Sequence, residues 1–345
     1  MCWNLAEKFT TFNYSPIYPL YPTMKRTLLT TCLCLLAYKS FCWGFYAHQK
    51  INYYATFLLP PQMMVLYKPN INFITEHAVD PDKRRYMVKE EGPRHFIDID
   101  HYGAYPYTNL PHKWKDAVAK YGEDSLRRYG IVPWHIVVML NRLTAAFKEK
   151  NFTAIMKNSA DLGHYIADSH VPLHASGNHN GQLTNQKGIH GFWESRVPEL
   201  LAEREFDFFI GKADFIADPL AFAWARVLES GKAVDSVLFL EKELTKEFGA
   251  DKKYAFENRK GILIRQYSTA FTNAYSKKLN GMVERRMRQS IYAVASFWYT
   301  AWVNAGQPDL KDLSSRKFSE AEASEFDQLD EQWKAGTQMI GKQEE

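Results

Sequence analysis

Apolar residues recur at a spacing of three to four in several long segments of the chain. This period places apolar side chains on one face of an α-helix, and no alternating run resembles a strand of a sheet. Pro219 suits a first helical position, Gly231 suits a helix end, and Pro172 ends the helix before it. The pattern therefore predicts an all-α fold. The clearest predicted helices are residues 134–148, 153–169, 219–230, 234–248 and 281–304.

The same pattern predicts a single multi-helix domain over residues 43–310. About 300 residues are enough to bury a substantial core in one domain, and the chain has neither an internal repeat nor a linker rich in Pro, Gly or Ser. Residues 90–130 are less regular and contain several prolines, so we expect loops there. Residues 311–345 are polar, and we expect this tail to add little to a site.

The first 42 residues have the features of a secretory signal peptide. Met24 is followed by a basic pair, by an apolar run over residues 28–38 and by a short segment that ends at Cys42. The run is well short of the roughly 20 residues that span a bilayer, which favours cleavage over an uncleaved anchor. We therefore expect a mature chain that begins at Trp43, is secreted or periplasmic and has no transmembrane segment. Residues before Met24 are interpreted as an extension upstream of the true start.

Cleavage at this point would change both the cysteine content and the charge of the chain. It would remove all four cysteines, so the mature chain would depend on its core and on bound metal for stability. It would also remove four basic residues and one acidic residue, which lowers the formal net charge from +4 to +1. A nearly neutral chain lacks the broad positive surface of a dedicated duplex-DNA-binding protein, although a nuclease for short or single strands is not excluded.

Five side chains of metal-binding type lie close together in the middle of the chain, with the spacing H-x3-D-x5-H-x15-H-x3-E. The first two and the last two are each four residues apart, a spacing that puts both members on one helix face and lets them bind one cation. One such pair would be a weak signal, but two pairs on either side of a third histidine predict a metal site. The five residues are His164, Asp168, His174, His190 and Glu194.

The types of these ligands limit the metal. All four cysteines lie at the extreme N-terminus, which excludes a thiolate zinc-finger site. Mixed imidazole and carboxylate ligands suit a catalytic Zn²⁺ site with an open position for water, and manganese or iron are the alternatives. The sequence therefore predicts metal-assisted hydrolysis.

These five residues and two further segments, WGFYAH and AVDPDKRR…RHFID, together resemble the superfamily of zinc-dependent phospholipases C and single-strand-specific zinc nucleases. The resemblance implies a helical domain with a trinuclear zinc cleft. It also implies that the free α-amine and the carbonyl oxygen of Trp43 bind zinc, so that cleavage of the signal peptide would create a ligand. The implied ligands, zinc by zinc, are Trp43, His48 and Asp168; Asp80, His95, His164 and again Asp168; and His174, His190 and Glu194.

The resemblance implies a hydrolase of phosphate esters. A water shared by two zinc ions about 3.5 to 4 Å apart can be a hydroxide at neutral pH and can attack phosphorus in line. Besides its implied role as a zinc ligand, Asp80 is a candidate for the base that orients this water. Lys83 falls where the nuclease branch has a basic residue near the phosphate, and it is a candidate for stabilising the transition-state charge. The alternative for Lys83 is an exposed lysine without a role.

The substrate stays open, because the features of the two branches conflict. The spacing of the first implied ligands and the sequence HFID at residues 95–98 resemble the nucleases. In that branch the residue at Phe96 stacks on a base and the residue at Asp98 reads the edge of the base. Glu194, where the nucleases have Asp, and the short loop that precedes it resemble phospholipase C instead. The alternative for Phe96 is an ordinary core residue.

Two other functions also stay open at this point. One is a phosphomonoesterase that acts on nucleotide 3′-phosphates, and the other is a non-catalytic, zinc-stabilised exported binding protein. Structural zinc sites are usually closed sets of four ligands, whereas nine ligands for three metals leave positions for water, which favours an enzyme. The sequence indicates no protein partner. The histidines outside the pattern are expected to be structural or on the surface.

Overall fold

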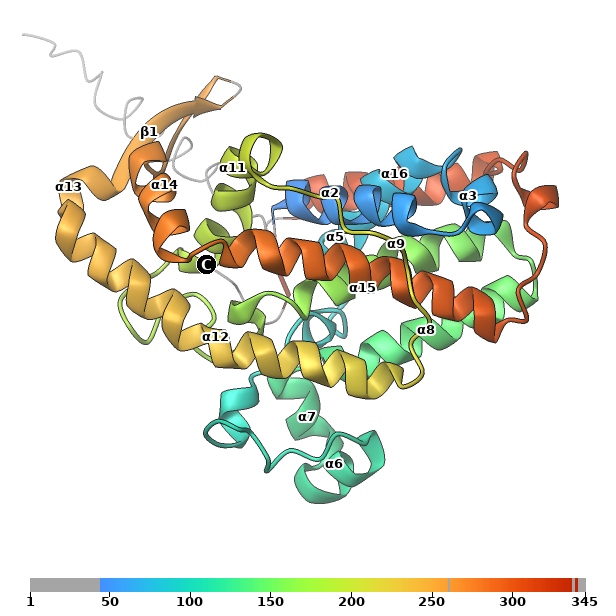
Figure 1. Cartoon of the computed structure of the whole chain (residues 1–345), viewed down its shortest axis with the longest axis horizontal. Helices are drawn as coiled ribbons and strands as arrows, with labels where there is room; N and C mark the ends of the chain where they lie inside the picture. Colours follow the sequence, from blue (N-terminus) through green and yellow to red (C-terminus); the bar gives the residue numbers. More distant parts are fainter. Residues whose placement is uncertain (1–43, 260, 337–338, 341–345) are drawn as a thin grey trace, which may run out of the picture. The chain divides into compact units, whose positions relative to one another are not determined.

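Helices form almost all of the regular structure in the part of the chain that the structure describes (Figure 1). The computed structural model describes residues 44–259, 261–336 and 339–340, which lie in one compact unit, Ser40–Glu345. The predicted signal peptide, the four cysteines and Trp43 lie outside the described residues. The helical class predicted from the sequence is confirmed.

The α-helices are α2 (Phe45–Ala55), α3 (Pro61–Tyr67), α4 (Ile71–Glu76), α5 (Asp80–Arg84), α6 (Trp114–Tyr121), α7 (Glu123–Tyr129), α8 (Val132–Lys148), α9 (Phe152–Asp168), α10 (Ile189–Gly191), α11 (Val197–Glu205), α12 (Pro219–Phe248), α13 (Ala250–Lys253), α14 (Thr269–Lys278), α15 (Met282–Asn304) and α16 (Glu320–Ala335).

Helix α9 crosses the middle of the fold. It begins after Asn151, whose side chain accepts a hydrogen bond from Ala154 N, and it ends at Asp168, shortly before Pro172. It packs against α2, α8 and α15, and a single apolar core connects these helices. The last two turns of α9 are fully surrounded by this core, so they carry polar side chains into the interior of the protein.

Helix α12 corrects the prediction of two helices separated at Gly231. The helix is continuous, and Gly231 lies in its interior. A Cβ atom at this position would lie 3.0 Å from Tyr107 Cε2 and 3.1 Å from Ile99 Cγ2. The glycine therefore allows a close approach of α12 to the loops before α6, and it does not end the helix. The start of α12 follows the prediction, with Pro219 in the first turn after Asp218.

A two-stranded antiparallel hairpin is the second correction, because the sequence was expected to contain no strands. Strands β1 (Tyr254–Arg259) and β2 (Ile262–Tyr267) connect α13 to α14 and pair with Tyr254 opposite Tyr267. The hairpin projects from the end of α12, α13 and α14 (Figure 1). Gly261, with φ +86°, makes its turn. The strands are too short, and the apolar run in β2 too continuous, for alternation to reveal them.

Residues 90–130, which were expected to be loops, include α6 and α7, and the polar tail includes α16. A capping box begins α16, because Ser319 accepts from Glu322 N while Glu322 accepts from Ser319 N. Helix α16 packs against α5. The remaining short turns are η1 (Thr56–Leu58), η2 (His77–Val79), η3 (Gly92–Arg94), η4 (Ile99–Tyr102), η5 (Pro172–Ala175), η6 (Phe192–Arg196, a π-helical turn) and η7 (Lys311–Leu313).

The length and apolarity of the helices can be compared with what a membrane span requires. Among the described helices, none by itself has the length and apolarity to cross a bilayer, although α7 and α8, which meet at a bend of 97°, pass this test as a pair.

Candidate metal centre

Buried side chains with nitrogen or oxygen donors form three adjacent groups inside the fold. Within each group the donor atoms lie within 4.8 Å of one another, and none of the residues involved is more than 4% exposed. His164 belongs to two groups, and His174 Nε2 of the third lies 3.8 Å from Asp168 Oδ1. The groups can hold metal ions. They are His48, His164 and Asp168; Asp82, His95 and His164; and His174, His190 and Glu194.

The two ligand pairs predicted from the sequence spacing are both present in this centre. His164 and Asp168 lie one turn apart near the end of α9. His190 on α10 and Glu194 on η6 also face each other, with His190 Nε2 2.9 Å from Glu194 Oε2. Between the two pairs, η5 contributes His174. The rise of about 5.4 Å per helical turn therefore brings each pair to one place, as the four-residue spacing requires.

Asp168 lies at the meeting point of the three groups. Its Oδ2 is 3.0 Å from His95 Nδ1 and 3.3 Å from His164 Nε2, and its Oδ1 is 3.4 Å from His48 Nε2. Burial by itself would raise the pKa of Asp168, but His164 and His174 hold this pKa well below its ordinary value. The carboxylate is therefore negative at neutral pH and presents an oxygen to more than one group.

Backbone carbonyls orient two of the histidines. His164 Nδ1 is 2.8 Å from Ala78 O, and His174 Nδ1 is 2.8 Å from His95 O. A carbonyl accepts only from a protonated nitrogen, so in each neutral ring Nε2 carries the lone pair and faces the centre. His174 Nε2 is buried and makes no hydrogen bond within the described residues. A metal ion at this nitrogen would satisfy it, as is usual for metal-bound histidines.

Glu91 lies behind His95 and was not identified from the sequence. It is fully buried, and its Oε1 is 3.6 Å from His95 Nε2. Arg84 and Arg94 lie 3.2 and 2.7 Å from its Oε2, and Tyr165 also donates to Glu91. Burial opposes the charge, but His95 and Arg84 lower the pKa of Glu91. A charged glutamate thus faces the side of His95 away from Asp168, an arrangement that increases the basicity of a ligand nitrogen.

The third group contains a fully buried carboxyl group. Burial raises the pKa of Glu194 from 4.5 to about 7, and its Oε1 makes no hydrogen bond within the described residues. His174 Nε2 lies 3.5 Å from its Oε2. Asn180, a second residue that sequence reasoning missed, positions the ligand segment by accepting from His190 N and Gly188 N. A divalent cation would supply the positive charge that this buried carboxylate lacks.

Asp82, and not Asp80, joins His95 and His164, which corrects the sequence assignment. Asp82 Oδ1 lies 3.7 Å from His95 Nδ1 and 3.6 Å from His164 Nε2. Asp80 is in none of the three groups, and its oxygens lie 2.6 Å from His77 Nδ1 and 2.9 Å from Lys83 Nζ. Residues two apart on a helix point about 200° away from each other, so only one of the two aspartates can face the centre.

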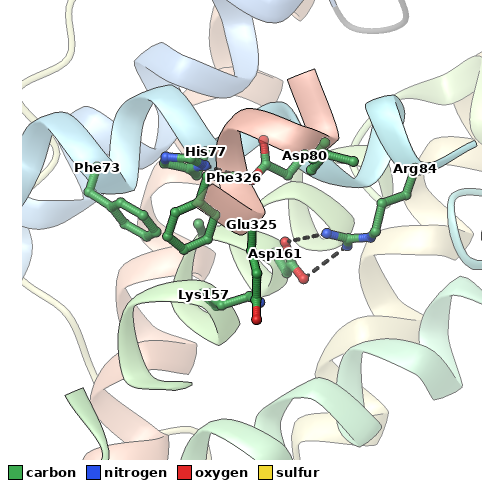
Figure 2. A pocket seen from close by; sticks show the side chains of 10 residues that line it. Phe73, His77, Asp80, Arg84, Lys157, Asp161, Glu325 and Phe326 are labelled. Carbon is green, nitrogen blue, oxygen red and sulfur yellow. Dashed lines mark hydrogen bonds and ion pairs between the residues drawn. The ribbon is translucent and has the colours of Figure 1, made fainter. Parts of the chain in front are cut away.

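Asp80 faces a different environment, a cavity of about 130 Å³ between α4, α5, α9 and α16. Figure 2 shows Asp80 beside His77 in this cavity, with Arg84 bound through two hydrogen bonds to Asp161. The charged lining side chains pair with each other, and Phe73 and Phe326 supply an apolar part of the wall. The cavity therefore lies between α16 and the rest of the fold and has both polar and apolar walls.

Lys83 leaves α5 on the side of Asp80, so it points away from the ligand groups. Lys83 Nζ lies 2.9 Å from Asp80 Oδ1 and 2.6 Å from Asp330 Oδ1 on α16, and these charges raise its pKa although burial opposes them. The structure instead places Arg85 beside the centre. Arg85 is fully buried, and its Nη1 lies 4.0 Å from Asp82 Oδ1. Burial lowers the pKa of Arg85, while the charges of Asp82 and Asp168 oppose this effect.

Phe96 and Asp98, the candidate base-binding residues, are both buried. Phe96 is 4% exposed and Asp98 7%. Val132 N donates to Phe96 O, and the backbone of Phe96 comes so close to Gly130 that a Cβ there would lie 2.1 Å from Phe96 O. Phe96 thus offers almost no surface on which a base could stack. The alternative, a core residue, describes its position better.

Trp43 lies outside the described residues, but its neighbour does not. Gly44 N donates to Ser195 Oγ at 2.8 Å, and Ser195 follows the ligand Glu194. A Cβ at Gly44 would lie 2.8 Å from Ser195 Cβ, so the glycine allows this close approach. His48, four residues further along α2, faces Asp168. The first described residues therefore lie against the metal centre.

Comparisons with known proteins add no family to this description. No protein-family model matches the chain, and no curated protein matches it. The candidate centre therefore depends on its own geometry. Eight buried nitrogen and oxygen donors in three adjoining groups can hold more than one divalent cation.

Proposed function

We propose that the protein is a zinc-dependent hydrolase of phosphate esters. The observation that supports this proposal most strongly is the trio of adjoining ligand groups that meet at Asp168. A single structural zinc needs four ligands, whereas adjoining groups of imidazoles and carboxylates suit a cluster of cations with open positions. These groups would hold zinc, which when bound would polarise phosphoryl oxygens and lower the pKa of water towards neutral pH.

The residues of the chain take distinct roles in this proposal. Asp168 faces two neighbouring ligand groups with its two oxygens and fixes their separation. Arg85, in place of Lys83, is the cation that we assign to balancing the negative charge of the ligand carboxylates, because its guanidinium lies beside Asp82. Glu91 orients His95 from behind. Trp43 is proposed as a further ligand through its α-amine, which requires cleavage of the predicted signal peptide.

The proposal includes membership of the zinc-dependent phospholipase C and zinc nuclease superfamily. The helical fold and the eight gathered donors support it, with Asp82 in the place first given to Asp80. It also includes three zinc ions for each chain and export from the cytoplasm. Both depend on the resemblance in sequence.

Within this superfamily we propose a phospholipid substrate. The buried position of Phe96 is the observation that favours it, since a nonspecific nuclease needs an accessible aromatic face for the base. Glu194 in the third group agrees with this choice. Single-stranded nucleic acid is the competing substrate.

A comparison of substrates tests this proposal. The chain from Trp43 onward is loaded with zinc and is assayed on a soluble short-chain phosphatidylcholine, on single-stranded DNA and on a nucleoside 3′-monophosphate, each with a chelated control. We expect release of phosphocholine alone. Cleavage of DNA alone would contradict the substrate, and zinc binding without turnover of any phosphate ester would contradict the enzyme and favour a binding protein. Asp168→Asn serves as the inactive variant, while Asp80→Asn controls for loss of a nearby carboxylate.

A further inference from the structure

The hairpin of β1 and β2 has an unusual solvent face. Side chains along it alternate between partly buried and exposed, so one face packs towards the protein and the other faces solvent. Phe256 and Leu263 lie on the solvent face and are 69% and 67% exposed. The register places Phe256 opposite Arg265 and Leu263 opposite Asn258, so these four side chains share the face. Two large apolar side chains therefore lie where a soluble hairpin normally has polar ones.

The glutamate of the hairpin lies on the face opposite to Phe256 and Leu263. Glu257 lies on the protein-facing side, where Arg196 Nη2 is 2.5 Å from its Oε1 and Gln266 also donates to it. On the solvent face, Arg265 stacks 3.6 Å above the ring of Tyr254. Arg265 is the basic side chain that the register places on this face, and Lys252 in α13 is also exposed, whereas Lys253 is buried and paired with Glu241. The solvent face thus combines apolar side chains with a positive charge, while Glu257 on the other face is neutralised against the protein.

The base of the hairpin is attached to the metal centre. Tyr267 at the end of β2 stacks on Phe192 with ring centroids 3.7 Å apart. Arg196 Nε donates to Tyr267 O and so holds the same strand. Phe192 and Arg196 are the first and last residues of η6, the turn that carries the ligand Glu194. Whatever the hairpin binds is therefore positioned relative to the third ligand group.

We propose that this hairpin face docks the protein on an anionic lipid bilayer. Exposed aromatic and aliphatic side chains enter the boundary between headgroups and acyl chains, and neighbouring cations are attracted to anionic headgroups, which is the combination found here. A second copy of the chain would bury the apolar residues equally well, but it would bring the basic residues of two hairpins together. The proposal rests on the proposed function to the extent that the docked surface supplies the phospholipid substrate.

Vesicle binding tests the proposal. The chain from Trp43 onward is suitable, since it contains every described element and lacks the apolar run 28–38, which would itself bind lipid. We expect sedimentation with vesicles of phosphatidylglycerol and phosphatidylcholine, much weaker sedimentation with pure phosphatidylcholine, and weakening by salt. Phe256→Ser with Leu263→Ser should reduce the binding constant by roughly tenfold or more. Phe209→Ser, which alters a residue that is 88% exposed elsewhere, is the matched control and should bind normally.

Several outcomes would overturn the docking proposal. Equal binding by the double variant and the control would do so, as would the absence of vesicle binding by the unaltered chain. Concentration-dependent dimerisation that the double variant abolishes would show that a second copy occupies the face. Circular dichroism establishes that the double variant is folded.

Hydrolysis of a soluble short-chain phospholipid separates this proposal from the proposed function. We expect the double variant to retain this activity while losing vesicle binding. Vesicle binding that depends on Phe256 and Leu263, in a chain that hydrolyses no phosphate ester, would support the docking and contradict the function. Hydrolysis without vesicle binding would contradict the docking alone.

Discussion

Asp82 and Asp80 are chemically identical and two residues apart, yet the structure gives them different surroundings. Asp82 lies between His95 and His164, whereas Asp80 binds His77 and Lys83. We predict that Asp82→Asn lowers the metal content of the purified protein by at least one ion and that Asp80→Asn leaves it unchanged, as measured by elemental analysis. Equal losses in both variants would contradict the assignment of Asp82.

The sequence could place most ligands but not this one, for a physical reason. His164, Asp168, His190 and Glu194 were identifiable because four-residue spacing has the same meaning on any helix. The segment VDPDKRR contains two aspartates and several basic residues. Only the orientation of α5 in the folded chain decides which of these side chains point towards the metal centre. Arg85 was missed for the same reason. Glu91 was missed because a carboxylate that touches a ligand from behind has no spacing rule.

His135 should make the protein sensitive to acid. Burial, with the charge of Arg94 nearby, lowers the pKa of His135 from 6.5 to about 3. The unfolded chain therefore binds more protons than the folded chain between these values, so stability is lost as the pH falls from 6.5 towards 3. We predict that, in the metal-free protein, His135→Gln loses less stability than the unaltered chain between pH 7 and 5. Urea unfolding at both pH values measures this difference. Equal losses of stability in the two proteins between pH 7 and 5 would mean that His135 does not contribute to the acid sensitivity.

Among the helices, α12 shows that a glycine need not mark a helix end. Gly231 was expected to end a helix, but it lies inside α12, where a Cβ would come within 3.0 Å of Tyr107 and 3.1 Å of Ile99. The long helices themselves were predicted closely: α8, α9 and α15 begin and end within two residues of the predicted positions. The hairpin and α16 were not predicted, since one is too short for a periodic signal and the other has no buried residue.

Gly163 provides a test of packing within α9. A Cβ at this position would lie 2.0 Å from Asn52 Oδ1, and Asn52 cannot easily move because it donates to Ile74 O and Ala160 O. Alanine normally favours a helix by about 1 kcal/mol over glycine. We nevertheless predict that Gly163→Ala lowers the free energy of unfolding by about 1 to 3 kcal/mol, because overpacking dominates.

Chemical denaturation of the metal-free protein measures this change. Gly191→Ala is the control, since Gly191 has helical backbone angles and a Cβ there would meet no atom within 4 Å. A stabilised Gly163→Ala variant would show that α2 and α9 are less closely packed than the structure indicates.

Export and metal binding are connected in the whole molecule through Trp43. Gly44 is hydrogen-bonded to Ser195, beside the ligand Glu194, so the chain enters the fold at the metal centre. If the α-amine of Trp43 is a ligand, only processing at this residue completes the site. We predict that one additional residue before Trp43 lowers the zinc content by one ion, measured by elemental analysis. An unchanged zinc content would remove the N-terminus from the set of ligands.

Hydrolysis of a soluble phosphodiester, measured as zinc is added to the metal-free chain from Trp43, tests whether the three ligand groups hold a catalytic zinc cluster. We predict no turnover without metal, turnover that increases until three equivalents of zinc are bound, and no turnover at any zinc concentration for Asp168→Asn. Full activity without metal, or a folded, zinc-saturated chain that hydrolyses no phosphate ester, would contradict this prediction.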